Sequence, residues 1–139
     1  MQTQYAPIST RIKAVIIDSI AIIVLMYAAV EVFNLFESIP NYIRISVFVG
    51  LFILYEPLLV SIFGATLGHF FNDIVVKQEA NENRNINFLL AIIRFITKSL
   101  LGWVSLLTVN SNSKKKAIHD YVAQSVVLPY KPNKKASTP

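Results

Sequence analysis

Four charged side chains lie within stretches of this sequence that are otherwise apolar. Asp18 interrupts "RIKAVIIDSIAIIV", Glu56 lies in a second apolar run, and Arg94 and Lys98 share a third. Arg94 and Lys98 are four residues apart and therefore lie on one face of a helix. An isolated charge near the middle of a membrane span costs about 2.5 to 3.5 kcal/mol. We therefore expect the two acids to pair with the two bases across helices.

Three kinds of chemistry fit such a cluster of charges. The charges can only fix how the helices pack, or Asp18 and Glu56 can carry ions or protons along a path. The cluster can also bind a polar ligand or an anionic lipid headgroup. The sequence contains no nucleophile elbow and no carboxylate pair in an exposed cleft, so we expect neither enzymatic activity nor a cofactor.

The other ionisable side chains point to weaker possibilities. Arg11 precedes Asp18 by seven residues, which places the two about 10 Å apart along a helix. Arg11 is therefore a poorer ion-pair partner for Asp18 than Arg94 or Lys98. We predict no metal site, because His69 and the His119–Asp120 pair supply too few ligands. We expect His119–Asp120 to form a helix cap and a surface contact, with Asp120 accepting amides at a helix start.

The elements that must position these charges are three apolar segments, each long enough as a helix to cross a bilayer core about 30 Å thick. They run over residues 12–33, 42–63 and 88–109, and Ser9 or Thr10 can cap the first. Hydrophobic residues make up 54% of the 139 residues and charged residues only 15%, against about 25% in soluble domains. The fold class is therefore an all-α membrane protein, a bundle of three hydrophobic segments in contact with the lipid bilayer.

Short elements connect and follow the segments. Within residues 64–87, "IVV" at 74–76 favours a strand that can pair with "SVVL" at 125–128, and "NENRN" is typical of a loop. Gly64 and Gly68 either shape a turn, which we favour, or let helices pack closely. We expect one membrane domain over residues 1–128 and a polar, disordered tail over 129–139.

The charges on the connecting segments conflict with three full crossings. The first link has two acids and no base, so it should face outward, and the N-terminus then faces the cytoplasm. Residues 110–139 contain six lysines and one acid, which accounts for the whole net charge of +5. Either the third segment re-enters and returns near Gly102, which keeps this basic region cytoplasmic, or the region is external. We favour the cytoplasmic tail, beside anionic lipid and not nucleic acid.

Four pieces of the chain, in this order and spacing, resemble the RDD family of small membrane proteins, named for one arginine and two aspartates. The pieces are "RIKAVIIDSI", "GATLGHFFNDIVV", the arginine-bearing third segment and "AIHDYVAQSVVL", and they cover residues 8–128. The resemblance places the signature on Arg11, Asp18 and Asp120. Two departures are His69 to Phe71 after Gly68, where the family has basic residues, and "AQS" where it has "AGT".

The resemblance implies an integral protein of the bacterial cytoplasmic membrane, in a family for which transport has been suggested. Our first hypothesis is a contribution to ion or small-solute transport, with Asp18, Glu56, Arg94 and Lys98 as the polar centre. Arg11 and Asp120 would then lie at the cytoplasmic border. Three segments enclose little space, so a homo-oligomer or another membrane protein is implied. The alternative is a membrane adaptor or assembly factor whose charges bind partner helices.

Overall fold

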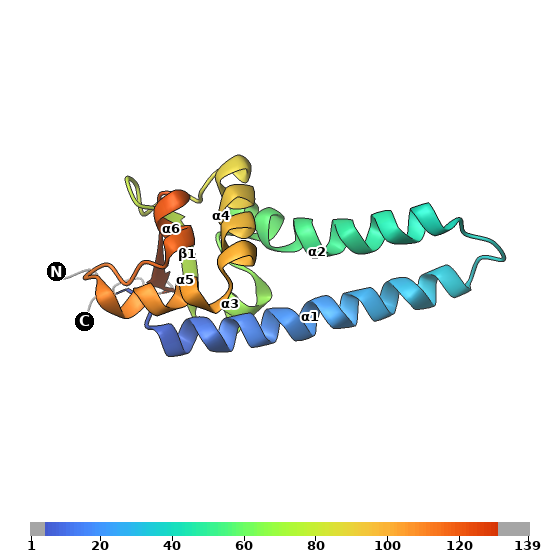
Figure 1. Ribbon diagram of the computed structural model, residues 1–139, viewed down its shortest axis with the longest axis horizontal. Helices are drawn as coiled ribbons and strands as arrows, with labels where there is room; N and C mark the ends of the chain where they lie inside the picture. Colours follow the sequence, from blue (N-terminus) through green and yellow to red (C-terminus); the bar gives the residue numbers. More distant parts are fainter. Residues whose placement is uncertain (1–4, 131–139) are drawn as a thin grey trace, which may run out of the picture.

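The computed structural model describes residues 5–130, apart from the side chain of Trp103. Two long helices, α1 (Ile8–Asn34) and α2 (Asn41–Phe63), form an antiparallel hairpin, and all other elements gather at one end of it (Figure 1). These elements are α3 (Leu67–Phe71), β1 (Ile74–Gln78), α4 (Phe88–Leu101), α5 (Trp103–Leu107), the 3-10 helix η1 (Thr108–Ser111), α6 (Ile118–Val122) and β2 (Ser125–Pro129). We call this end of the hairpin the sheet end, and the opposite end, at residues 35–40, the link end.

The hairpin consists of the two helices in the described chain that are each long and apolar enough to cross a membrane. They have 27 and 23 residues, which correspond to about 40 and 35 Å of helix. Most of their large apolar side chains are exposed, among them Ile20, Ile23 and Ile45. Because no protein covers these side chains, their natural environment is lipid, and the first two predicted segments are confirmed.

The start of α1 differs from the prediction. Pro7 occupies the N-cap position without a side-chain cap bond, so the expected cap at Ser9 or Thr10 is wrong. The helix begins at Ile8, directly after Pro7, and the residue before Pro7 makes a tertiary contact: the Ala6 amide donates to the Val127 carbonyl at 3.0 Å. The chain is thereby fixed against β2 just before its first helical turn.

The third apolar segment is broken into two helical stretches. It forms α4, then bends by 101° before the helical stretch 104–111, and Gly102 at the break has φ 52°, which favours glycine. In Figure 1, α4 runs across the direction of the hairpin. The segment therefore breaks at Gly102, and a single helix over 88–109 is not what forms.

The two strands show that the third segment begins and ends on the same side. β1 precedes it and β2 follows it, and they pair antiparallel with Val76 opposite Val127. The Glu79 amide also donates to the Gln124 carbonyl at 2.9 Å. A segment whose two flanks are hydrogen-bonded to each other cannot span a bilayer. The predicted pairing of "IVV" with "SVVL" is confirmed.

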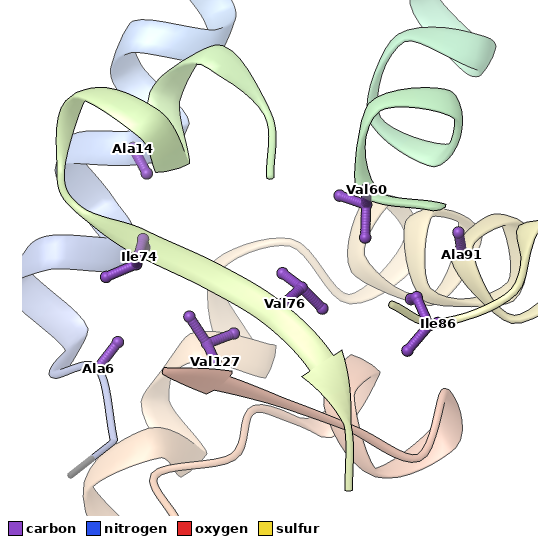
Figure 2. Packing of buried hydrophobic residues seen from close by; sticks show 8 residues of the cluster. All are labelled: Ala6, Ala14, Val60, Ile74, Val76, Ile86, Ala91 and Val127. Carbon is purple, nitrogen blue, oxygen red and sulfur yellow. The ribbon is translucent and has the colours of Figure 1, made fainter. Parts of the chain in front are cut away.

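A small apolar core holds the sheet end together. Its buried side chains come from α1, α2, both strands, α4 and their flanks, as Figure 2 shows: Ala6, Ala14, Val60, Ile74, Val76, Ile86, Ala91 and Val127. Ala14 lies where α1 packs against α3, and Ala91 belongs to α4, which packs against α2 and α6. This core fixes the position of α4 relative to the hairpin, and α4 holds two of the four predicted site residues.

The C-terminal boundary lies two residues beyond the predicted one. β2 includes Pro129, and the Tyr130 amide donates to the Asp73 carbonyl at 2.6 Å. Residues 129 and 130 therefore belong to the folded unit and not to the expected disordered tail. Residues 131–139, for which disorder is expected, lie outside the described part of the chain.

Candidate functional site

Asp120 joins three helices at the sheet end. Its carboxylate accepts from Arg11 Nη1 of α1 at 2.5 Å and from Arg94 Nε of α4 at 3.2 Å. Within α6 it also accepts the Ala117 amide at 3.1 Å, so the expected contact with helix N-terminal amides is confirmed. The side chain is fully buried. Burial alone would raise the pKa of Asp120, but Arg11, His119 and Arg94 together hold this pKa well below its usual value.

Glu56 is the second acid that holds two bases. Arg94 Nη1 pairs with one of its carboxylate oxygens, and Lys98 Nζ lies 2.7 Å from the other. The pairing of Glu56 with both bases across α2 and α4 is therefore confirmed. Arg94 bridges the two acids, which links Arg11, Asp120, Arg94, Glu56 and Lys98 in a sequence of alternating sign that we call the ion-pair chain.

The ion-pair chain explains how these charges tolerate burial. Arg11, Glu56, Arg94 and Asp120 are each at most 7% exposed, and each contacts an opposite charge. Removing one partner from a buried pair leaves an uncompensated charge, which is costly. Arg11 and Asp120 were expected at the border of the site, but they belong to the same buried network as Arg94 and Glu56. Lys98 is the member of the chain with an accessible side chain, at 20% exposure.

Asp18 lies outside the ion-pair chain. It accepts three hydrogen bonds from uncharged donors: Tyr55 Oη at 2.9 Å, Thr66 Oγ1 at 2.6 Å and the Gly68 amide at 2.8 Å. Among residues 5–130, no basic side chain forms an ion pair with Asp18. The expected pairing of Asp18 with Arg94 or Lys98 is therefore wrong.

Two of the three donors that bind Asp18 come from the N-cap and the first turn of α3, and the third, Tyr55, comes from α2. Gly64 has φ +75° and ends α2, and Gly68 lies so close to α1 that a Cβ atom there would be 2.0 Å from the Ala14 carbonyl oxygen. The first glycine thus shapes the turn, and the second permits the close packing that was the less favoured expectation. The sequence reasoning missed Tyr55 and Thr66, although the "GATLG" spacing was a usable signal for Thr66.

The two histidines are buried parts of the scaffold. His69 Nδ1 accepts the Thr66 amide at 3.2 Å in a capping box, and His119 Nδ1 lies 2.6 Å from Ser105 Oγ. Burial lowers the pKa of each histidine to about 3, so both are neutral at pH 7. The expected surface contact of His119 and Asp120 is wrong, because both are buried. Residues 5–130 contain no cluster of three or more His, Asp or Glu side chains suited to a metal ion.

A pocket of about 350 Å³ opens beside the ion-pair chain. It is lined by the polar side chains of Asp18, Glu56, Lys98, Ser19 and Ser99 and by the apolar side chains of Val15, Ile22, Phe95 and Leu106. The pocket therefore lies between α1, α2, α4 and α5. It brings Asp18 and the accessible end of the ion-pair chain to one surface, so three of the four predicted site residues line it, and the fourth, Arg94, contacts Glu56 and is not part of the lining.

The basic segment after η1 is partly neutralised. Glu79 accepts from Lys114 Nζ and from Lys116 Nζ, each at 2.6 Å, and the Lys116 ammonium lies 4.5 Å from the centre of the Tyr121 ring. These hydrogen bonds lower the pKa of Glu79. Lys116 is buried, which leaves Lys114 and Lys115 as the accessible lysines of this segment. Lys131, Lys134 and Lys135, the other lysines of the expected lipid contact, lie outside the described residues.

An apolar hairpin able to cross a membrane, a third segment that returns to its own side and a buried ionic centre define a small integral membrane protein. The sequence matches the model of the RDD family over residues 5–124, and the chain belongs to that family. Comparison with curated proteins and with solved structures finds no match. The three residues that the family resemblance singles out, Arg11, Asp18 and Asp120, all lie at the sheet end, but only Arg11 and Asp120 contact each other.

Proposed function

We propose that this RDD-family membrane protein contributes to the transport of an ion or a small solute across the bacterial cytoplasmic membrane. Asp18 is the group that binds the moving cation or proton. The observation that supports this is the contrast among the three buried acids. Glu56 and Asp120 each hold two bases, whereas Asp18 has only uncharged donors and lines the pocket.

The charges around Asp18 favour weak, exchangeable binding. Arg11, Arg94 and Lys98 balance Asp18, Glu56 and Asp120, so the buried set is neutral when Asp18 is ionised and no cation is bound. A cation at Asp18 gains a local contact without a large excess of negative charge around it. Transport requires binding that is favourable enough for entry and weak enough for release. Asp18 meets this requirement better than Glu56 does.

The hairpin alone cannot enclose a pathway. Two crossing helices leave the side of the pocket open, so transport requires a second copy of the chain or another membrane protein beside it. The adaptor function remains the second candidate, because the exposed apolar side chains of α1 and α2 can also contact partner helices.

Flux into liposomes tests the proposal. The purified chain should move Na⁺, protons or a small organic cation above the rate of empty vesicles, and Asp18→Asn should reduce this flux at least tenfold because the neutral amide cannot bind a cation by charge. Glu37→Gln is the matched control, since it removes an exposed acid in the link and should leave the flux unchanged. A wild-type flux equal to that of empty vesicles, together with a stable co-purifying membrane protein, would overturn the proposal in favour of the adaptor.

A further inference from the structure

The pocket beside Asp18 is much larger than a bare ion needs. One water occupies about 30 Å³ of liquid, so about 350 Å³ corresponds to roughly twelve waters. Pockets for small organic ligands begin at about 300 Å³. The lining is also of two kinds: it includes the Asp18 carboxylate, and it includes the apolar side chains of Ile22, Phe95 and Leu106. Such a pocket suits a ligand with a charged group and an apolar body.

The chain itself places a group of this kind in the pocket wall. The Lys98 side chain is a primary ammonium on a four-carbon stem, and its Nζ lies 2.7 Å from Glu56 Oε2 at the edge of the pocket. The pocket therefore already accommodates an alkylammonium group against one of its two carboxylates. The second carboxylate, Asp18, faces the same pocket and has no ammonium partner among the described residues.

We propose that this pocket binds a primary alkylammonium compound, with its ammonium group at Asp18 and its apolar chain along Ile22, Phe95 and Leu106. The inference rests on the proposed function in using the same carboxylate, and it names the class of solute. A primary ammonium has three donors, which can reach a carboxylate and nearby hydroxyl groups, whereas Na⁺ requires a shell of oxygen ligands. Apolar walls provide no such shell but do stabilise an alkyl chain.

Binding to the full chain in lipid nanodiscs tests this inference. Calorimetric titration with n-hexylammonium should give saturable binding after subtraction of empty nanodiscs, which corrects for partition into lipid. The uncharged n-hexanol should bind at least tenfold more weakly, because it lacks the charge that Asp18 attracts. Ile22→Trp should fill the apolar part of the pocket and weaken hexylammonium binding at least tenfold.

Two further variants make the test specific. Ile23→Trp is the matched control, because Ile23 is 65% exposed and does not line the pocket, and it should change the dissociation constant less than twofold. Ser99→Leu, on the facing helix, fills the pocket without altering α1 and should weaken binding as Ile22→Trp does. Equal binding of hexanol and hexylammonium, or equal losses in Ile22→Trp and Ile23→Trp, would overturn the inference.

The binding test and the flux test fail independently. Saturable hexylammonium binding without any flux would overturn the transport proposal and leave the pocket assignment standing. Flux of Na⁺ that depends on Asp18 but is not inhibited by hexylammonium would support transport and overturn the alkylammonium assignment.

Discussion

At the scale of single residues, the three buried acids differ in the partners that neutralise them. Asp120 has two arginines, Glu56 has an arginine and a lysine, and Asp18 has three uncharged donors. A carboxylate between two guanidinium groups is a structural element, because its loss would leave both cations buried without compensation. A carboxylate held by neutral donors keeps its attraction for a cation.

Asp120→Asn should therefore destabilise the protein strongly. The amide keeps a similar shape but removes the charge opposite Arg11 and Arg94, at a cost of about 3 kcal/mol. The expected result is a clear fall in the thermal unfolding midpoint in detergent, measured by size-exclusion fluorescence. Glu37→Gln, in the exposed link, should leave the midpoint unchanged. Equal midpoints for Asp120→Asn and the wild type would show that the ion-pair chain does not stabilise the fold.

His69 should make the protein sensitive to acid. Its pKa is about 3 in the folded state, against 6.5 for an unperturbed histidine, so between these values the unfolded chain binds a proton that the folded chain does not. Stability from this group is complete above pH 6.5 and is lost as the pH falls towards 3. His69→Asn keeps an acceptor for the Thr66 amide without titrating, and should flatten the fall of the unfolding midpoint between pH 6.5 and 4.

The pKa of His119 is also lowered by burial, so His119 makes the same kind of contribution to acid sensitivity. The fall of the unfolding midpoint with decreasing pH should therefore become less steep in His69→Asn but should not vanish. Asp120 contributes in a separate range, because its lowered pKa affects stability only below the usual aspartate value of 3.8. Superimposable pH profiles for His69→Asn and the wild type would contradict the assignment of a buried neutral His69.

At the scale of elements, the contact between α3 and α1 decides the surroundings of Asp18. α3 has only five residues, yet its start supplies two of the three donors to the carboxylate. The contact depends on Gly68, whose missing side chain lets the α3 backbone reach α1. An amphipathic pattern cannot reveal such a contact, because the helix is too short to show one.

Gly68→Ala should separate α3 from α1. The new Cβ atom would be 2.0 Å from the Ala14 carbonyl oxygen and 2.8 Å from Asp18 Cγ, so the backbone must shift, at a cost of about 2 kcal/mol. Gly50→Ala is the matched control in α2, because no atom lies within 4 Å of its Cβ position. The unfolding midpoint should fall in Gly68→Ala and should stay level or rise slightly in Gly50→Ala. The opposite order would contradict the close packing of α3 on α1.

At the scale of the whole molecule, the antiparallel strands fix the topology. Because β1 and β2 are hydrogen-bonded, residues 79–124 begin and end at the sheet end of the hairpin. The N-terminal side of α1 is at the same end through the contact between Ala6 and Val127. The basic segment at Lys114 to Lys116 is therefore on the side of Arg11 and Lys13, which removes the conflict with the charge rule.

Accessibility of single cysteines should confirm this arrangement. The sequence has no native cysteine, so Asn83→Cys, Ser113→Cys and Glu37→Cys each introduce one exposed thiol. A membrane-impermeant maleimide should label Asn83→Cys and Ser113→Cys from one side of sealed vesicles and Glu37→Cys from the other. Labelling of Ser113→Cys from the same side as Glu37→Cys would show that the third segment crosses the bilayer.

The two spans, a break at Gly102, the pairing of the two short strands and the need for acids and bases to meet could be predicted from the sequence alone. These features depend on local properties: the length of an apolar run, the freedom of a glycine and the cost of an isolated charge in lipid. Which charges meet depends on how the helices pack. Arg11 and Asp120 are 109 residues apart, and α6 brings them together.

Asp18 shows the reason for this division most clearly. The free-energy cost of placing a carboxylate in lipid means that Asp18 needs polar partners. Charged and uncharged donors both reduce this cost, so the sequence could not distinguish an ion pair from three hydrogen bonds. Because Gly68 packs closely on α1, the Thr66 hydroxyl and the Gly68 amide reach the Asp18 carboxylate, and Asp18 forms hydrogen bonds in place of an ion pair. The geometry of one close backbone contact thus decided which of the three acids is left without a cation.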